Sequence, residues 1–429
     1  MKIGIDCRTI LNPHGGELAG VGHYTYFLVK ALLDLDHKNT YVLFFDDRFK
    51  DFSVFKRENV QIRTFPFYQY KKFMPLLYSQ LLVSALLDKE KLAVFHAPAN
   101  TAPLFYNKPL VVTIHDLAIY KYPDFFPPQI LNRQVFSTKV LVPKTLERAK
   151  KIIAVSKNTK TDIIEQFGIP EERIKVIYEG AINLGKNCPD GNQLAEIRKK
   201  YGIGEKYLLY LGTIEPRKNI TALIKAFRNL YMSYDSPAKG YQLIIAGGRG
   251  WKDEPVYKAI ADANASILGI NQKRSGQERR SGIDKRTEQK KKTQGERRQS
   301  DRRISDVVKH IGYVSHTDKL CLLANAACFV FPSLYEGFGL PVLEAISLGT
   351  PVITSNLSSL PEIITPETGI LVNPNKESEL IEAMTQILGD EGLREEMGIK
   401  GRERAKEFTW EKCARETLEA YEEAVGGKL

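Results

Sequence analysis

The stretch FVFPSLYEGFGLPVLEAISLGTPVITS, residues 329–355, decides the fold of the second half of the chain. It begins with an apolar run that ends at Ser333 and continues through a loop that contains Gly337 and Gly339. Pro341 then stands where a helix is expected to begin, a position that tolerates proline well. A second apolar run, PVITS, follows that helix. Strand, helix and strand in this order predict a parallel sheet covered by helices.

The same alternation of apolar runs and helical patterns extends over the whole chain. The apolar runs are KIGID, YVLFF, VQIRTF, AVFHA, LVVTIHD, IIAVS and KVIYEG in the first half, and YLLYLGT, YQLIIAGG, VVKHIGYV, CFVFPS and PVITS in the second. A chain of 429 residues is also long enough for two domains of roughly 200 residues each. Periodicity lapses in AINLGKNCPDGN, residues 181–192. We therefore predict two doubly wound α/β domains, 1–185 and 186–407, with a ligand-binding cleft between them.

The positive charge of the chain is concentrated in one segment. The net charge is +11, and residues 271–305 contain 13 Lys and Arg against 5 Asp and Glu, a net +8. Only Ile283 and Ile304 are large and apolar there, too few to offset the entropy lost on ordering. We expect a disordered basic insertion within the second domain. Binding of nucleic acid or an anionic membrane by this insertion stays open as an alternative, although no aromatic residues are interleaved for base stacking.

The sequence gives no sign of export or of a membrane-spanning helix. The apolar run Leu76 to Leu87 is shorter than the roughly 20 residues that a bilayer requires and is interrupted by Gln80. The five cysteines are scattered and form no C-x-x-C pair, so neither a disulfide framework nor a zinc site is expected. We expect a cytoplasmic protein. Lys71 and Lys72 precede this apolar run, so a peripheral contact with the inner face of the membrane is an open alternative to packing of the run as a core helix.

Two loops contain residues suited to an anionic ligand. Glycines at 337 and 339 allow close backbone approach, and the following helix N-terminus favours a phosphate. Glu336 and Glu344 flank that point and suit hydrogen bonds to sugar and ribose hydroxyls. In the second loop, YLLYLGTIEPRKNI, Arg217 and Lys218 follow a strand end and suit a diphosphate. Taken alone, the first loop is equally often a tight turn with two solvated glutamates, and two adjacent basic residues such as those of the second loop are more often plain surface.

Two further segments lie at expected strand ends of the first domain. LVVTIHD places His115 and Asp116 at the end of a strand, where a lone histidine more often has a structural hydrogen bond than a catalytic role. GGELAGVGHYTYFLVKAL places Gly20 and Gly22 in the first loop between strand and helix. That loop lacks a G-x-G-x-x-G match, so a dinucleotide site is poorly supported.

Taken together, these segments resemble the retaining glycosyltransferases of family 4, over nearly the whole chain apart from residues 271–305. The most specific likeness is the E-x7-E element within PSLYEGFGLPVLEA, and the segments GTIEPRKN, AGVGHYT, TIHD and AVSKNTKTDI match other blocks of that family. The resemblance implies the GT-B fold, with two facing Rossmann-like domains and a donor held mainly by the second. It also implies that residues 408–429, which include FTWEKCARETLEAYEEA, form a helix that returns to the first domain.

The resemblance assigns roles by position. Glu336 is expected to bind hydroxyls of the transferred sugar, Glu344 the ribose and Lys218 the diphosphate. His115 is expected beside the reacting sugar. The remaining expected ligand contacts come from backbone or flanking positions, namely Gly20 and Gly22 on the acceptor side and Gly337, Phe338, Gly339 and Leu340 at the phosphates. Many members have an arginine where this chain has Thr213, and Arg217 is the expected substitute.

The implied activity is metal-independent transfer of a hexosyl group with retention of configuration, because the cations and the helix N-terminus neutralise the departing diphosphate. No cofactor is expected beyond the donor, GDP-mannose as the first choice or a UDP-sugar. The expected acceptor is a glycan or lipid-linked sugar in the synthesis of cell-envelope polysaccharide or lipopolysaccharide. Sugar-nucleotide epimerases and phosphorylases share the architecture, so they stay open as alternatives, as does a peripheral protein that binds anionic surfaces.

Overall fold

A computed structural model describes residues 1–11, 20–66, 76–181, 191–280 and 306–426. Its chain divides into two compact units. Unit 1 comprises Met1–Ile182, Glu336–Leu340 and Lys406–Leu429, and unit 2 comprises Asn183–Tyr335 and Pro341–Ala405. The short segment Glu336–Leu340 groups with unit 1 by its contacts, although its neighbours in sequence belong to unit 2.

Unit 1 contains a seven-stranded sheet in the order β3-β2-β1-β4-β5-β6-β7, and all its strand pairs are parallel. The strands are β1 (Lys2–Asp6), β2 (Thr40–Asp46), β3 (Val60–Phe65), β4 (Val94–Ala97), β5 (Leu110–Ile114), β6 (Lys151–Ala154) and β7 (Ile174–Val176). Helices connect them: α1 (Val21–Leu35), α3 (Leu76–Lys89), α4 (Ala118–Lys121), α5 (Pro128–Phe136), the π-helix η3 (Ser137–Leu141), α6 (Val142–Arg148) and α7 (Lys157–Phe167), with the 3-10 turns η1 (Ser53–Phe55), η2 (Pro123–Phe125) and η4 (Glu171–Arg173).

Unit 2 contains a six-stranded sheet in the order β10-β9-β8-β11-β12-β13, again with parallel pairs. Its strands are β8 (Lys206–Leu211), β9 (Tyr241–Ala246), β10 (Val308–Gly312), β11 (Cys328–Phe331), β12 (Val352–Ser355) and β13 (Gly369–Val372). The helices are α8 (Gly191–Tyr201), η5 (Pro216–Lys218), α9 (Ile220–Met232), α10 (Glu254–Arg280), α12 (His316–Ala324), α13 (Leu340–Leu348), α14 (Leu360–Ile363), α15 (Glu377–Gly389) and α16 (Glu391–Ala405). The prediction of two doubly wound parallel sheets is confirmed.

Both sheets are buried because helices cover their two faces. The interior strand β5 has no exposed residue, as expected for its uninterrupted run of apolar and β-branched side chains. Helix α3 contributes Val83 and Leu87 to the hydrophobic core of unit 1, so that part of the apolar run packs on the sheet, while Leu81 is exposed. Within the described part of the chain, no helix is long and apolar enough to cross a bilayer.

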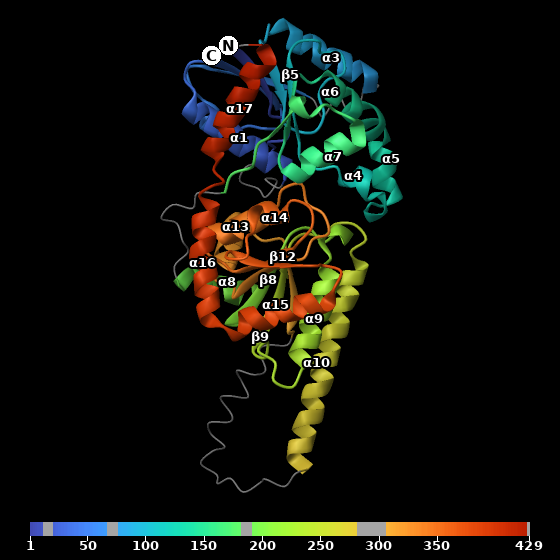
Figure 1. Cartoon of the computed structure of the whole chain (residues 1–429), viewed down its shortest axis with the longest axis vertical. Helices are drawn as coiled ribbons and strands as arrows, with labels where there is room; N and C mark the ends of the chain where they lie inside the picture. The colour runs from blue at the N-terminus through green and yellow to red at the C-terminus, as the bar shows by residue number, and fades with distance from the viewer. Residues whose placement is uncertain (12–19, 67–75, 182–190, 281–305, 427–429) are drawn as a thin grey trace. The chain divides into compact units, whose positions relative to one another are not determined.

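The last helix, α17 (Trp410–Val425), belongs to unit 1 and packs against α1 and the ends of β4, β5 and β6 (Figure 1). Thr409 caps its N-terminus, accepting a hydrogen bond from the backbone N–H of Lys412 at 3.1 Å. The buried Tyr421 reaches His96 on β4, and their side chains lie 2.7 Å apart. The predicted return of the C-terminal helix to the first domain is therefore observed within unit 1.

The first ten residues of the predicted basic insertion, 271–280, are helical. We expected a disordered segment from residue 271, but α10 continues to Arg280 and extends past the sheet of unit 2 (Figure 1). Glutamine, lysine, arginine and glutamate favour helix, and elongating an established helix is much easier than nucleating one. A segment too polar to form a hydrophobic core can therefore still form a helix. Residues 281–305 lie outside the described residues, as do Lys71 and Lys72.

Candidate functional site

The cationic loop of unit 2 follows β8, as predicted. Pro216 begins the short turn η5, and Asn219 ends it at φ 56°, a left-handed conformation that asparagine tolerates. Lys218 is buried, and its Nζ lies 4.9 Å from the centre of the Phe331 ring, at the end of β11. A parallel sheet aligns the carboxyl ends of its strands, so the turn after β8 meets the loop after its neighbour β11.

Arg217 joins these two loops. Its Nε donates to Glu215 at 2.6 Å, and its Nη1 donates to the carbonyl of Tyr335 at 3.0 Å. The Arg217 carbonyl in turn accepts hydrogen bonds from the Leu334 N–H and the Ser333 hydroxyl. The guanidinium is thus paired with a buried carboxylate and fixes the backbone of the β11 loop. Arg217, the predicted second diphosphate cation, thus has protein partners in both loops.

Glu344 lies on α13, buried and paired with a residue that the sequence analysis did not select. Its Oε1 accepts a hydrogen bond from Lys319 Nζ of α12 at 2.6 Å, and the two side chains are 6% and 17% exposed. A charge-assisted bond between two such side chains fixes the position of the carboxylate. The remaining oxygen of Glu344 can accept a hydrogen bond from a hydroxyl group.

The glycine-rich segment Glu336–Leu340 is closely packed within unit 1. The Gly337 carbonyl accepts a hydrogen bond from Thr159 at 3.2 Å. A Cβ atom at position 337 would lie 1.8 Å from the carbonyl oxygen of His115, so only glycine allows this approach. Phe338 stacks on Tyr178, with ring centres 5.8 Å apart. Two predicted site segments, the His115 strand end and the Gly337 loop, are thus brought together.

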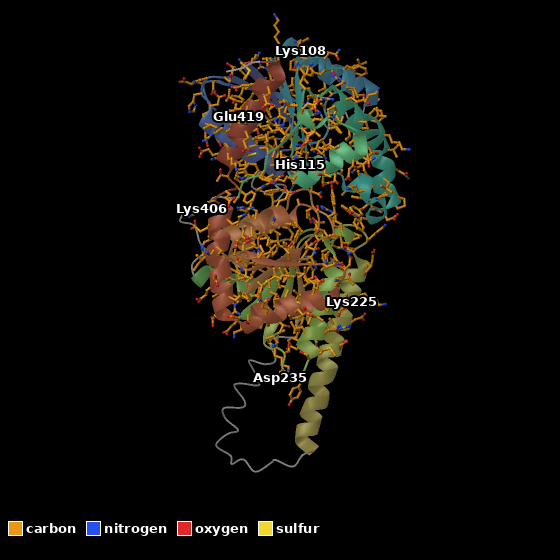
Figure 2. All side chains as sticks on the ribbon, viewed as in Figure 1. Lys108, His115, Lys225, Asp235, Lys406 and Glu419 are labelled. Atoms are coloured by element: carbon orange, nitrogen blue, oxygen red, sulfur yellow. The ribbon has the colours of Figure 1, made fainter. Side chains whose placement is uncertain are left out.

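His115 directly follows β5 and is nearly buried (Figure 2). Its backbone N–H donates to Asn100, and its Nε2 lies 2.8 Å from the carbonyl oxygen of Pro98. On the other side of the ring, Nδ1 lies 3.4 Å from Oε1 of Glu179. The histidine therefore has partners at both ring nitrogens.

The predicted acceptor-side glycines are at the start of α1. Gly20 precedes the helix with φ 59°, a conformation that L side chains rarely adopt, and it is exposed. Gly22 is buried in the first turn. Gly15 and Gly16 lie outside the described residues.

Sequence reasoning missed Glu179, Glu215 and Lys319, which are the partners of three predicted site residues. Glu179 follows β7 and Glu215 follows β8, so both lie at carboxyl ends of strands. That position was the available signal, since the carboxyl edge is where such sheets bind ligands. No comparable signal existed for Lys319, because it lies within α12 and not at the end of a strand.

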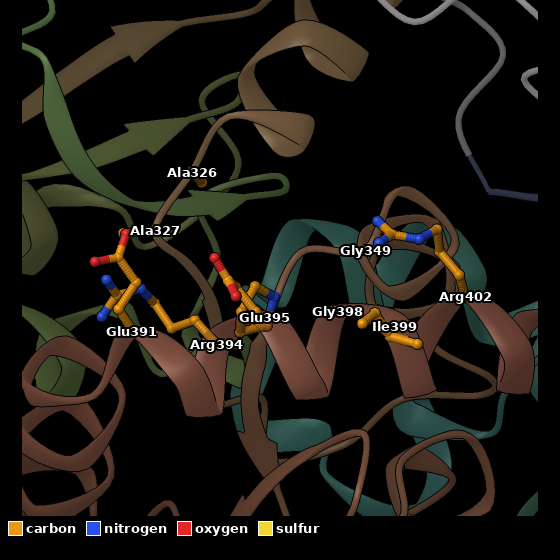
Figure 3. Close-up of a pocket in the computed structure, with 10 residues that line it drawn as sticks. Ala326, Ala327, Gly349, Glu391, Arg394, Glu395, Gly398, Ile399 and Arg402 are labelled. Atoms are coloured by element: carbon orange, nitrogen blue, oxygen red, sulfur yellow. The ribbon is translucent and has the colours of Figure 1, made fainter.

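A hollow of about 400 Å³ on unit 2 lies elsewhere, beside α16 (Figure 3). Ala326 and Ala327, just before β11, and Pro351, just before β12, line it together with Arg394 and Arg402. These positions precede their strands, so the hollow is at the amino edge of the sheet. It contains none of the predicted site residues. Across the described ranges, no group of three or more His, Cys, Asp or Glu side chains is arranged to hold a metal ion.

Comparison with known proteins identifies the family. The model described as "Glycosyltransferase Family 4" matches residues 18–181, and that described as "Glycosyl transferases group 1" matches residues 194–404. The O-antigen chain mannosyltransferase B of Escherichia coli is 31% identical over 329 residues, which cover 76% of this chain and 74% of that protein. The chain belongs to glycosyltransferase family 4. The predicted family and a glycosyltransferase activity are thus confirmed.

Other relatives of this glycosyltransferase are more distant. The O-antigen chain mannosyltransferase RfbU of Salmonella typhimurium is 27% identical over 67% of this chain and 63% of its own length. The serotype-specific mannosyltransferase WbdA of Escherichia coli is also 27% identical, over 64% of this chain but only 29% of WbdA.

Solved structures agree on the fold of this glycosyltransferase. Anabaena Alr3699/HepE, in complex with UDP and glucose, matches with a TM-score of 0.64 and 18% identity over 98% of both chains. WaaG, a glycosyltransferase involved in lipopolysaccharide biosynthesis, matches with a TM-score of 0.63 and 14% identity over 99% of this chain and 100% of that chain. The GT-B fold is confirmed.

Proposed function

We propose that this glycosyltransferase moves a hexosyl group from a nucleotide diphosphate sugar to a glycan or lipid-linked acceptor in the synthesis of a cell-envelope polysaccharide. Mannose from GDP-mannose is the first choice of donor, and a UDP-sugar is the second. The observation that carries the choice of sugar is the 31% identity to an O-antigen mannosyltransferase over three quarters of both chains. The complex of HepE with UDP supports a nucleotide sugar as the donor.

Lys218 is the residue that we assign to the diphosphate. It is buried at the carboxyl edge of the unit 2 sheet, where its charge is poorly screened by water. Arg217 fixes the loop after β11 through its bond to the Tyr335 carbonyl. Glu344, held by Lys319, would accept hydrogen bonds from the ribose. Glu336 would bind the transferred sugar, and the backbone from Gly337 to Leu340 would bind the phosphates.

We further propose that transfer needs no metal and retains the anomeric configuration. A cation and the N-terminus of α13 would stabilise the charge that develops on the leaving diphosphate. The acceptor would attack from the face that the diphosphate leaves, and its proton would pass to a diphosphate oxygen. No carboxylate needs to act as a covalent nucleophile, unlike the paired carboxylates of retaining glycosidases.

The test is a panel of GDP-, UDP- and ADP-sugars measured with EDTA present. A donor that binds the native state raises its melting temperature, and slow hydrolysis of that donor is followed by nucleotide release. We expect GDP-mannose to stabilise the wild type and to be hydrolysed by it. Glu336→Gln should lose hydrolysis, whereas the exposed Glu382→Gln on α15 should retain it.

Two outcomes would contradict the proposal. Absence of any shift in melting temperature would mean that the chain binds none of these donors. Phosphorolysis of a glycan would indicate a phosphorylase. Interconversion of sugar nucleotides without transfer would indicate an epimerase. The anomeric proton of the transferred sugar, observed by NMR in the product, decides between retention and inversion.

A further inference from the structure

The geometry of the pair formed by His115 and Glu179 limits where its protons can lie. Nε2 of His115 lies 2.8 Å from the Pro98 carbonyl oxygen, which can only accept a hydrogen bond. Nε2 must therefore be protonated. Nδ1 lies 3.4 Å from Oε1 of Glu179. If neither of these two atoms held a proton, two lone pairs would face each other in a buried site, so one proton must lie between them.

The proton between these atoms belongs to one of the two partners. Imidazole is a stronger base than a carboxylate, and the geometry leaves Nδ1 as the ring atom that faces Glu179. Glu179 is 3% exposed, and its Oε2 has no hydrogen-bond partner among the described residues. A buried carboxylate with one unpaired oxygen is stabilised most by a cation at its other oxygen, here Oε1. Both considerations favour the imidazolium with the carboxylate.

Among the described residues, Tyr24, Cys413 and His96 are coupled electrostatically to the pair. Burial raises the pKa of Tyr24, whose ring on α1 contacts His115 at 4.7 Å between centres, and of Cys413 on α17. Burial, together with the charge on His115, lowers the pKa of His96 on β4 to about 3. All three are therefore neutral near pH 7. Asp116, next in sequence, accepts a hydrogen bond from the backbone N–H of Ala118.

We propose that Glu179 is a positioning residue for His115, and that its buried carboxylate keeps protons on both ring nitrogens of this histidine. The ring is then a fixed cation whose two N–H groups are used by the Pro98 carbonyl and by Glu179. It has no lone pair with which to accept a proton from the acceptor hydroxyl. The further step, that this cation contributes to transfer, rests on the proposed function, in which His115 lies beside the reacting sugar.

The proton arrangement is tested by ¹⁵N NMR of the histidine rings, with His115 assigned from the spectrum of His115→Gln. In the wild type at pH 7, we expect both ring nitrogens of His115 to be protonated. In Glu179→Gln, we expect only Nε2 to remain protonated, because an amide can donate to Nδ1. Glu179→Asp should restore the doubly protonated ring. A wild-type ring with unprotonated Nδ1, or a ring unaffected by Glu179→Gln, would overturn the proposal.

The contribution to transfer is tested separately by the pH profile of donor turnover. The wild type should keep a constant kcat from pH 6 to 8. Glu179→Gln should lose about tenfold in kcat between pH 6 and pH 8, with donor KM unchanged, because the ring can then lose its Nδ1 proton. The control substitution Glu165→Gln, at an exposed residue of α7, should leave the pH profile unchanged.

The two measurements distinguish an error in the role of the pair from an error in the proposed function. If NMR shows the doubly protonated ring but Glu179→Gln has the wild-type profile, the role of the pair in transfer is wrong. If the wild type turns over none of the donors, the proposed function is wrong, and the NMR result still decides the state of the pair.

Discussion

The carboxyl edges of the two sheets have the same parallel topology but different functional side chains. In unit 1, the residue after β5 is His115, and its partners are a carbonyl oxygen and a buried carboxylate. In unit 2, the residues after β8 are Arg217 and Lys218, and Arg217 is paired with Glu215. The first edge pairs a histidine with a buried carboxylate, whereas the second presents the lysine and arginine side chains of one turn. Strand position determines where a site lies, and the loop residues determine its chemistry.

The strongest test of this comparison is the removal of the fixed charge at Lys218. We expect Lys218→Ala to lose about 10²–10³-fold in kcat, by analogy with loss of one donor that stabilises a developing oxyanion. Steady-state turnover of the donor identified by the panel is the measurement. Lys225→Ala, an exposed lysine on α9, is the control and should keep full activity (Figure 2). Unchanged turnover in Lys218→Ala would remove the diphosphate assignment.

Substitution of Arg217 tests whether its charge binds the donor or stabilises the fold. Arg217→Ala leaves the carboxylate of Glu215, which is 4% exposed, without this cation. We expect a loss of about 3 kcal/mol in the free energy of unfolding, as for a broken buried pair, measured by urea denaturation. Arg415→Ala breaks an exposed pair with Glu411 on α17 and should change stability little. If Arg217→Ala kept its stability but lost donor binding, Arg217 would belong with Lys218 as a ligand cation.

Sensitivity to acid should be a property of unit 1. His96 is fully buried between Thr113 and Tyr421, and burial, followed by the charge on His115, lowers its pKa to about 3. The unfolded chain binds this proton near pH 6.5 and the folded chain does not, so stability is full above pH 6.5 and falls as the pH drops toward 3.

At pH 5 this linkage amounts to about 2 kcal/mol for His96. Urea denaturation at pH 7.5 and pH 5 should show a smaller loss in His96→Gln than in the wild type. His37→Gln, at an exposed position before β2, should keep the wild-type loss. An equal pH dependence in His96→Gln and wild type would show that another group is responsible.

The smallest expected effect concerns Lys319, which positions a carboxylate in unit 2. Lys319→Ala should raise the donor KM by about tenfold with kcat nearly unchanged, because it loosens Glu344 without touching the reacting atoms. Lys319→Arg should retain most of the affinity. Lys376→Ala, which removes an exposed partner of Glu379, is the matched control. A large fall in kcat in Lys319→Ala would instead place this lysine at the reaction itself.

The sequence alone determined the architecture and the positions of the main site segments. Apolar runs of strand length that alternate with helical patterns leave few arrangements other than parallel sheets, because both faces must be buried. Pro341 was expected where a helix begins, and α13 begins at Leu340. Strand β13, Gly369–Val372, was missed, and it begins with a glycine, which weakens a strand pattern.

Only the tertiary structure decided how the site residues are paired. Glu179 and His115 are 64 positions apart in sequence and meet because their strands end at the same edge of one sheet. Lys319 of α12 reaches Glu344 of α13 across 25 positions of sequence, and Arg217 reaches Tyr335 because β8 and β11 are neighbours. Residue type and local pattern identify which groups can bind or hold a proton. Their charge state and orientation depend on burial and on partners distant in sequence, and these exist only once the sheets have formed.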